Sequence, residues 1–554
     1  MAEGGSVATG YADNESDLNL FFYCSEIPSF RTRKNIYKKI ANLDFTSGTR
    51  DFDIFTANGV QVKVEYLRIH DTEKILRTVN NKTLPEDPEF WAIDECGKES
   101  LRRKHEILKG MQQCLILYDP RSILQDWKME YSDYPRKNQV ALIEALWNAI
   151  SEWTKEDDFG IALARNDIFH LCWMLNYRLA DMLWLLATIN GQYIYGMKWC
   201  KHWIEQFKIK PQNFYNRISI ILNSRNLKKK TEDFLLLIQE LHEITKDQIP
   251  EAKIPRKGVE NIKRGLSRMT QKKTLYVPNL WQSICQRLVE EYKKFPEVRA
   301  MVLWGSIAVG LEDDRTEDID IYAFDNKLPS RMARQKLIRK LSDEASSVRG
   351  EKYIDIFHIN GIQIHVNHCH IDITEQYLWS KLRGERPKYP LPWNVPEPGE
   401  LYESRTLTDP EGLVSGWHEM LDSHMNRVKT RTIRRAVASI ASEFPELKKT
   451  MVRNDQIYFH WQITKILISL FEILFAINEK YHYCYYFKWI GQLTKRSPLE
   501  PPNCVKRMEH IFMGSRRWSI AKRYEEVERL LNDFDSFLRT QGFRENMNQL
   551  FHSQ

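Results

Sequence analysis

Two hydrophobic patterns alternate along this chain. The apolar run 301–304 breaks at a Gly-Ser pair, and a second apolar run follows from residue 318, so both predict β-strands. Apolar residues at helical spacing dominate 137–245 and 411–545, which predicts helices packed against one another. Strands followed by a helical region, in both halves of the chain, indicate an α+β protein.

Each group of predicted strands contains a hairpin. Residues 58–59 and 360–361 are both Asn-Gly and lie between alternating strands, and Asn-Gly is the preferred sequence of a type I′ turn. A basic amphipathic helix is predicted before each hairpin, near 32–40 and 331–345. The sequence therefore predicts two β-regions built on the same plan.

Blocks of sequence in the first half recur in the same order in the second half. FDIFTANGVQVKVEYLRIHDTEKIL at 52–76 matches IDIFHINGIQIHVNHCHIDITEQYL at 354–378, and three further pairs of blocks match. One of these pairs contains Arg-Asn-Asp at 165–167 and at 453–455, where a helix cap and an interface or substrate contact are both open interpretations. A period of about 300 residues indicates a duplicated multi-domain unit and not a solenoid.

The composition is that of a folded globular protein, with 42% apolar and 12% aromatic residues among 554. A chain of this length predicts about two to four domains. Nine cysteines without a CxxC pair or a Cys/His metal spacing predict reduced thiols. The opening residues lack the basic region and apolar core of a signal peptide, and no apolar stretch suits a membrane span. We therefore expect a cytoplasmic protein with no membrane partner.

The net charge of +7 is mild for this length. It suits an anionic small ligand and does not by itself indicate nucleic acid, which we do not expect as a partner. The basic segment 246–278 is interpreted as a solvated linker, with nucleic-acid contact as the minor alternative.

The strongest chemical signal is Gly305-Ser306 followed by Asp318-x-Asp320. Because side chains alternate along a strand, the two aspartates project from the same face. Two adjacent carboxylates repel each other unless a divalent cation lies between them, and Mg²⁺ binds carboxylates together with substrate phosphates. The glycine lets backbone N–H groups approach phosphate oxygens closely, and the serine adds a hydroxyl group.

This arrangement of strand, Gly-Ser and Asp-x-Asp resembles the polymerase-β-like nucleotidyltransferase superfamily. Members often carry a third carboxylate on the hairpin strand, but here that face offers Gln363, His365 and Asn367. We therefore take Asp355 on the adjoining strand as the third metal ligand, with a carboxylate on the hairpin surface as the alternative. The resemblance implies Mg²⁺, with ATP or another NTP as co-substrate.

The helical part of the second half resembles kanamycin nucleotidyltransferase and related antibiotic nucleotidyltransferases. That resemblance implies that Glu472, the sole charge in ILISLFEILFAIN, is the general base, and that Gly305 and Ser306 hold the triphosphate. A core glutamate in a salt bridge is the alternative for Glu472. Lys488, beside Trp489, is expected to reach a phosphate, with a solvated lysine as the alternative.

In the first half, Asn19 stands where the second half has Asp320, and the strand and helix before the motif are missing. We interpret this half as a degenerate partner that completes a pseudo-dimer within one chain, which would allow the chain to be monomeric, with a second working site as the alternative. The predicted domains are a degenerate nucleotidyltransferase-like domain at 1–136, a helical domain at 137–245, the linker at 246–278, the nucleotidyltransferase domain at 279–410 and a helical substrate-binding domain at 411–554.

The expected function is transfer of a nucleoside monophosphate, AMP from ATP, to a hydroxyl of a small polar acceptor. The resemblance points to an aminoglycoside-like antibiotic, and a biosynthetic intermediate fits as well. Two alternatives are a nucleotide-binding regulatory pseudoenzyme and an enzyme that modifies protein or RNA.

Overall fold

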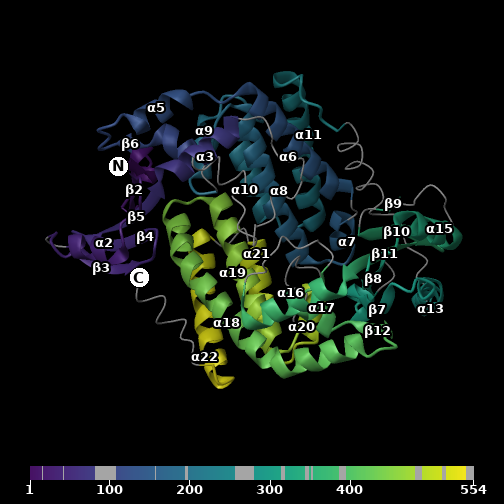
Figure 1. Ribbon diagram of the computed structural model, residues 1–554. Coiled ribbons are helices and arrows are strands. Elements are labelled where there is room, and N and C mark those ends of the chain that lie inside the picture. The colour runs from purple at the N-terminus through teal and green to yellow at the C-terminus, as the bar shows by residue number, and fades with distance from the viewer. Residues whose placement is uncertain are drawn as a thin grey trace. The chain divides into compact units, whose positions relative to one another are not determined.

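The fold is described from a computed structural model (Figure 1). The described residues are 1–14, 16–40, 43–80, 108–155, 158–193, 197–255, 280–312, 318–342, 349–350, 353–385, 395–480, 489–514 and 519–543. They form two compact units, each assembled from three segments of the chain. Unit 1 comprises Met1–Asp157, Leu175–Arg264 and Lys449–Trp461; unit 2 comprises Asp158–Met174, Gly265–Lys448 and Gln462–Gln554.

Unit 1 contains a six-stranded mixed sheet with the order β3-β4-β5-β2-β1-β6. Its strands are β1 Ala2–Gly4, β2 Leu18–Cys24, β3 Leu43–Gly48, β4 Phe52–Ala57, β5 Val60–Arg68 and β6 Leu115–Ile116. β2 and β5 are parallel, and the other neighbours are antiparallel.

Helices occupy most of the rest of unit 1. They are α1 Gly5–Ala8, α2 Phe30–Tyr37, α3 Ile69–Asn80, α5 Ile123–Glu130, α6 Arg136–Lys155, α9 Cys200–Gln206, α10 Phe214–Asn223, α11 Leu227–Gln248 and the part of α8 Ile168–Ile189 from residue 175 onward. The segment 449–461 adds the end of one long helix and the start of another.

Unit 2 contains a six-stranded sheet with the order β12-β7-β8-β11-β10-β9. Its strands are β7 Val298–Trp304, β8 Asp318–Asp325, β9 Arg349–Gly350, β10 Ile354–Ile359, β11 Ile362–His370 and β12 Arg405–Thr408. β8 and β11 are parallel and the other neighbours antiparallel. Read from the opposite edge, this is the strand order of the first sheet.

Besides the start of α8 (168–174), unit 2 contains helices that make up most of its remainder. They are α7 Asp158–Ala164, α13 Leu280–Tyr292, α14 Gly305–Ala308, α15 Arg331–Leu341, α16 Ile371–Arg383, α17 Pro398–Tyr402, α18 Leu413–Val452, α19 Gln456–Ile477, α20 Ile490–Lys495, α21 Cys504–Met513 and α22 Ile520–Thr540, of which α18 and α19 are shared with unit 1. The prediction of an α+β protein with mixed sheets is confirmed.

The two faces of β8 pack against different helices. Ile319 and Ile321 lie in a core with residues of α13 and α15, as alternation along the strand predicts. Tyr322 and Phe324, on the other face, pack with residues of α16, α17 and α18. Asp318 and Asp320 share this second face, at the start of the strand, where they are only partly buried. The candidate site therefore lies on the α16–α18 side of the sheet.

Both predicted Asn-Gly hairpins are present. Asn58 and Asn360 have φ of 51° and 52°, and the glycines after them have φ of 81° and 74°. Positive φ at both central residues is the geometry of a type I′ turn, so this prediction is confirmed. The basic helices are also present, as α2 and α15.

The first sheet retains the strand that the sequence analysis took to be missing. Ala2–Gly4 forms a short strand beside β2 and runs directly into α1, as β7 runs into α14. Three residues are too few to reveal a strand by alternation, whereas the neighbouring strand pairs with them residue by residue.

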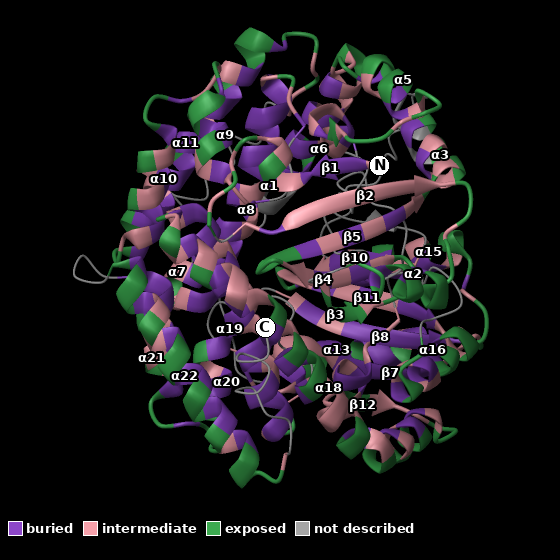
Figure 2. Ribbon diagram, turned by 90° about the vertical axis from the view of Figure 1, so that its left-hand side faces the viewer, coloured by how far each residue is buried: buried purple, intermediate pink, exposed green. Residues whose placement is uncertain are grey.

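Among the described residues, one helix, α19, is long and apolar enough to cross a membrane. In its most apolar stretch, 78% of the residues are buried inside the protein (Figure 2 colours buried residues purple), so α19 is an interior helix. The linker predicted at 246–278 falls largely outside the described residues, and the predicted domain boundaries remain predictions.

Candidate active site

The site begins at the turn from β7 into α14. Gly305 has φ of +76°, which disfavours any residue with a side chain. A Cβ atom added there would lie 2.7 Å from Oδ2 of Asp320, so a larger residue would displace the Asp320 side chain. The absence of a side chain brings the backbone of the Gly-Ser turn directly against one of the two predicted aspartates.

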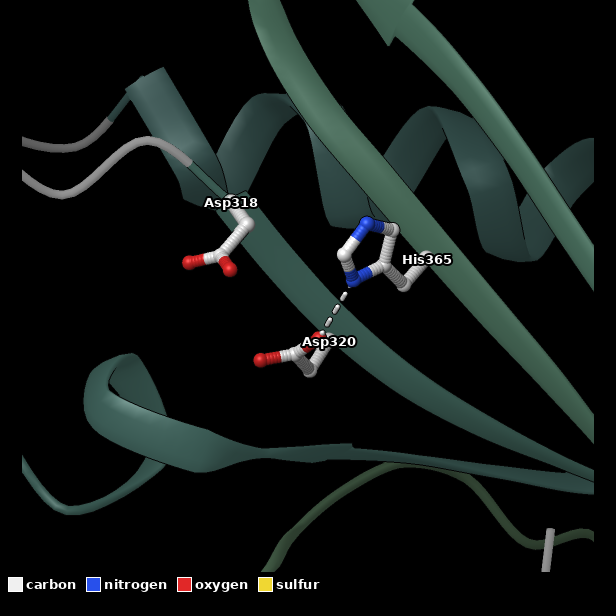
Figure 3. A group of neighbouring side chains, drawn as sticks. All are labelled: Asp318, Asp320 and His365. Atoms are coloured by element: carbon white, nitrogen blue, oxygen red, sulfur yellow. Dashed lines mark hydrogen bonds and ion pairs between the residues drawn. The ribbon is translucent and has the colours of Figure 1, made fainter. Parts of the chain in front are cut away.

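Three side chains converge beside this turn. The structure brings together Asp318 and Asp320 of β8 and His365 of β11, and their potential ligand atoms all lie within 4.8 Å of one another (Figure 3). The parallel register places His365 opposite Asp320, and its Nδ1 lies 3.0 Å from Oδ1 of that aspartate. The two aspartates therefore share a face, as predicted, and a histidine stands at the third position.

The donor set fits a hard divalent cation. Two carboxylates supply the oxygen ligands that Mg²⁺ prefers, and substrate phosphates usually complete its shell. The histidine nitrogen is a poorer ligand for Mg²⁺, but its contact with Asp320 orients that carboxylate, as outer-shell partners commonly do. Asp318 and Asp320 would thus hold the ion, with His365 as a positioning residue.

Asp355, the predicted third ligand, is not brought to this group. In β10 it pairs with Val366, which in turn pairs with Ile321, so it belongs to the opposite, core-facing side of the sheet. It is 1% exposed and forms an ion pair of 2.5 Å with Arg334. Tyr292 and His368 also contact it, at 3.1 and 3.0 Å. The sequence identified the strand of Asp355 correctly, but the face of the sheet on which Asp355 lies depends on strand pairing.

The same buried arrangement occurs in unit 1. Asp53 pairs with Arg33 at 2.9 Å and accepts a hydrogen bond from Tyr37 at 3.0 Å. Because both sheets contain a buried arginine–aspartate pair at this place, the architecture of the sheet explains the position of the pair. A buried ion pair of this kind needs such hydrogen bonds to offset the cost of desolvation.

The remaining predicted site residues are Glu472 and Lys488. Glu472 of α19 is 19% exposed and pairs with Arg435 of α18, Nη2 to Oε1, at 3.0 Å. This ion pair agrees with the alternative interpretation, in which Glu472 is a core glutamate in a salt bridge. Lys488 lies outside the described residues.

A further carboxylate near the site was not identified from the sequence. Glu400 of α17 accepts a hydrogen bond from Tyr322, two residues after Asp320, at 3.0 Å. Burial is the main cause that raises the pKa of Glu400; hydrogen bonds from the Glu397 N–H and from Tyr322 lower it, and the negative charges of Glu397 and Asp320 raise it, with a net value of about 7. In the sequence, the one pattern that involves Glu400 is the capping-box spacing from Glu397 to Glu400. That signal predicts a helix start and says nothing about the distant strand.

The counterpart of the site in unit 1 has a different composition. Asp17 lies at the position of Asp318, Asn19 at that of Asp320 and Lys63 at that of His365, as the matching strand registers show. Lys63 Nζ lies 2.5 Å from Asp17 Oδ2, and Asn19 Nδ2 donates to Asp17 Oδ1 at 3.2 Å. A protein ammonium group, and not a second carboxylate, completes this cluster.

Both Arg-Asn-Asp motifs cap a helix with their aspartate, and the other contacts of each motif lie inside a single unit. Asp167 accepts from the backbone N–H of His170 at 3.2 Å, a helix cap, and from that of Trp489 at 2.9 Å. Arg165 lies over the ring of Trp489, 3.6 Å from its centroid. These contacts lie within unit 2, which therefore contains a segment from the first half of the sequence.

The second Arg-Asn-Asp motif, at 453–455, makes similar contacts within unit 1. Arg453 lies 3.9 Å from the ring centroid of Trp199 and binds Asp13 through two hydrogen bonds of 2.7 and 3.0 Å. Asp455 accepts from the backbone N–H of Tyr458 at 3.2 Å.

Residues 400–490 match a family model described as a domain of unknown function, DUF4037. None of the curated proteins matches the chain. Among solved structures, the chain is similar to a nucleotidyltransferase-like protein from Exiguobacterium sibiricum 255-15, with 11% identity and a TM-score of 0.27, covering 47% of this chain and 78% of that one. A likeness at this level assigns neither fold nor function.

Proposed function

We propose that this chain is a Mg²⁺-dependent nucleotidyltransferase that transfers a nucleoside monophosphate, AMP from ATP, to a hydroxyl group of a small polar acceptor. The observation that carries the proposal is the convergence of Asp318 and Asp320 beside the Gly-Ser turn. A triphosphate with a bound metal ion needs carboxylates to hold the ion and backbone N–H groups close to its phosphates. The two aspartates and the adjacent glycine turn offer both. No other group of three or more potential ligands is found among the described residues.

In this proposal the acceptor oxygen attacks the α-phosphorus, the bond to pyrophosphate breaks, and the acceptor proton passes to a carboxylate. Bound Mg²⁺ would neutralise negative charge on the triphosphate and on the departing pyrophosphate. Asp318 and Asp320 would hold the ion, Gly305 and Ser306 would face the phosphates, and His365 would keep Asp320 oriented. Lys488 is assigned to a phosphate by resemblance.

Two carboxylates compete for the role of base. The resemblance assigns this role to Glu472, whose carboxylate forms an ion pair with Arg435. Glu400 is favoured by its contact with Tyr322 and by a pKa of about 7, close to what proton transfer at neutral pH requires. Glu400→Gln and Glu472→Gln separate them, because loss of a general base costs about 10²–10⁴-fold in kcat.

The proposal includes a tandem duplication, in which unit 1 is the degenerate copy. The same strand order, the same parallel pair and the same buried arginine–aspartate pair in both sheets support it. Each unit also contains a short segment from the other half of the sequence, as expected if two intertwined subunits of an ancestral dimer were fused. A cytoplasmic location and a monomeric state belong to the same proposal.

The acceptor class is an aminoglycoside-like antibiotic or a biosynthetic intermediate. The test is pyrophosphate release with Mg²⁺, each of the four NTPs and a panel of aminoglycosides, lincosamides and simple sugars. We expect acceptor-dependent release that Asp320→Asn abolishes. Nucleotide binding without release under any condition would contradict the proposal and favour a regulatory pseudoenzyme, and labelling of protein or RNA from radiolabelled ATP would favour a macromolecular acceptor.

A further inference from the structure

The unit 1 cluster presents a cation to solvent where the unit 2 cluster presents acidic oxygens. Lys63 is 29% exposed, whereas the aspartate that it binds, Asp17, is 6% exposed. In unit 2, Asp320 itself is 19% exposed. A ligand that approaches the unit 1 site therefore meets an ammonium group before it meets a carboxylate.

The ammonium group takes the place that the metal ion would take. Lys63 is opposite Asn19 in the parallel register, as His365 is opposite Asp320, and its Nζ reaches Asp17 at 2.5 Å. Asn19 is neutral, so the cluster lacks the second negative charge that attracts a divalent ion. A fixed lysine supplies one positive charge at the same point.

Two more lysines lie near this cluster. Burial alone would raise the pKa of Asp17, but the hydrogen bond and charge of Lys63, together with the charges of Lys198 and Lys449, hold that pKa well below its usual range. Lys449 belongs to the segment of unit 1 that comes from the second half of the sequence. The positive charges of three lysines thus act on this one carboxylate.

The glycine turn of the unit 2 site is retained in unit 1, and a group of aromatic rings follows it. Gly5 has φ of +72°, and a Cβ there would lie 2.8 Å from Asn19 Nδ2, so the close turn of the unit 2 site is retained. Beyond the turn, Tyr11 stacks on His202 with ring centroids 5.3 Å apart and an interplanar angle of 9°. Trp199 lies against both rings.

We propose that unit 1 binds a phosphate-bearing anion at this site without a divalent cation, with Lys63 in the role of the metal. Lysine is a common ligand for phosphate as a point charge, and the turn backbone and aromatic rings would contact the rest of the molecule. The chemistry is shared by nucleotides and by inorganic polyphosphates. The inference concerns unit 1 alone and does not depend on catalysis in unit 2.

The test is isothermal titration calorimetry of the full-length protein in EDTA with ATP, pyrophosphate and inorganic phosphate as separate probes. We expect the wild type to bind at least one of them, and Lys63→Gln to weaken that binding by about tenfold or more, because it removes a charged hydrogen-bond donor. Lys229→Gln, at an exposed lysine of α11, is the matched control and should leave the affinity unchanged. Tighter binding of ATP than of pyrophosphate would identify a nucleotide, and equal binding a polyphosphate.

Two further variants guard against a folding defect. Lys63→Arg preserves the charge and should retain most of the affinity, and Asn19→Asp keeps the lysine but adds a negative charge that should weaken anion binding. Absence of binding by the wild type in EDTA would overturn the proposal. So would an unchanged affinity in either Lys63→Gln or Asn19→Asp. Pyrophosphate release with Mg²⁺, measured on the same Lys63→Gln sample, reports separately on the function proposed for unit 2.

Discussion

The two sheets of this protein share a strand order but carry different charged groups at the same place. In unit 2, Asp318 and Asp320 lie beside the glycine turn and close to His365, and the three side chains could hold a cation. In unit 1, Lys63 fills the corresponding place and pairs with Asp17. On the same strand geometry, asparagine in place of aspartate and lysine in place of histidine replace a carboxylate with a neutral amide and add an ammonium group.

The architecture around both sites is unchanged by this difference. Both turns require glycine at positive φ, and both sheets contain a buried arginine–aspartate pair on the opposite face. The comparison therefore separates residues that maintain the fold, such as Asp53 and Asp355, from residues that determine the chemistry. Four predictions follow from that separation.

Asp320→Asn gives unit 2 the asparagine of unit 1 and should have the largest effect. Loss of one of two carboxylate ligands removes several kcal/mol of metal-dependent stabilisation, so Mg²⁺-dependent turnover should fall by roughly a thousandfold. Pyrophosphate release measures it, with the reciprocal Asn19→Asp as the control that leaves turnover intact. Equal losses in the two variants would mean that both units take part in catalysis.

Asp355→Asn tests whether this aspartate is structural. Removing one partner of a buried ion pair costs about 3–5 kcal/mol, and Asp53→Asn in unit 1 should cost a similar amount. Chemical denaturation measures the free energy of unfolding, and calorimetry with Mn²⁺ measures metal binding on the fraction that remains folded. A stable Asp355→Asn protein that no longer binds metal would instead support the role as a ligand.

The double substitution Asn19→Asp with Lys63→His should build a second metal site. It restores two carboxylates and a histidine at the positions found in unit 2, and the close approach of Gly5 is already present. We expect one more Mn²⁺ ion per chain than in the wild type, measured by calorimetric stoichiometry. Lys63→His alone is the control, and an unchanged ion count in the double variant would show that the unit 1 geometry is unsuited to a metal.

The smallest effect concerns the dependence of stability on pH. In unit 2, His368 lies beside the buried Asp355, at the strand position that Tyr66 occupies in unit 1. Burial lowers the pKa of His368, but its contacts with Asp325 and Asp355 more than offset this and raise it above the usual 6.5. A raised pKa stabilises the protonated form, so this contribution is complete below about pH 6.5 and lost as the pH rises through the higher folded value.

Unit 2 should therefore lose stability above neutral pH through this group. The melting temperature followed from pH 6 to 9 should fall more for the wild type than for His368→Tyr, which copies unit 1. Parallel curves for the two proteins would contradict the assignment.

The candidate site was only partly predictable from the sequence. Alternation along one strand placed Asp318 and Asp320 on one face, and the Gly-Ser step placed a close turn beside them. Asp355 was assigned to the metal because its strand was known but its pairing was not, and a register that places it opposite Val366 turns it toward the core. Glu400 was missed because it reaches Tyr322 from 78 residues away, through a helix whose only local signal was its cap.

The sequence by itself determined what depends on neighbouring residues: the alternating strands, the Asn-Gly hairpins, the glycine turns and the Asp-x-Asp pair. These follow from backbone sterics and from side-chain periodicity, which act over a few residues. The tertiary structure alone decided which distant groups meet. The contact of Lys63 with Asp17 joins strands 46 residues apart, and the segment 158–174 packs in unit 2 and not with its own half of the chain. Such contacts depend on strand register and helix packing, which no local pattern encodes.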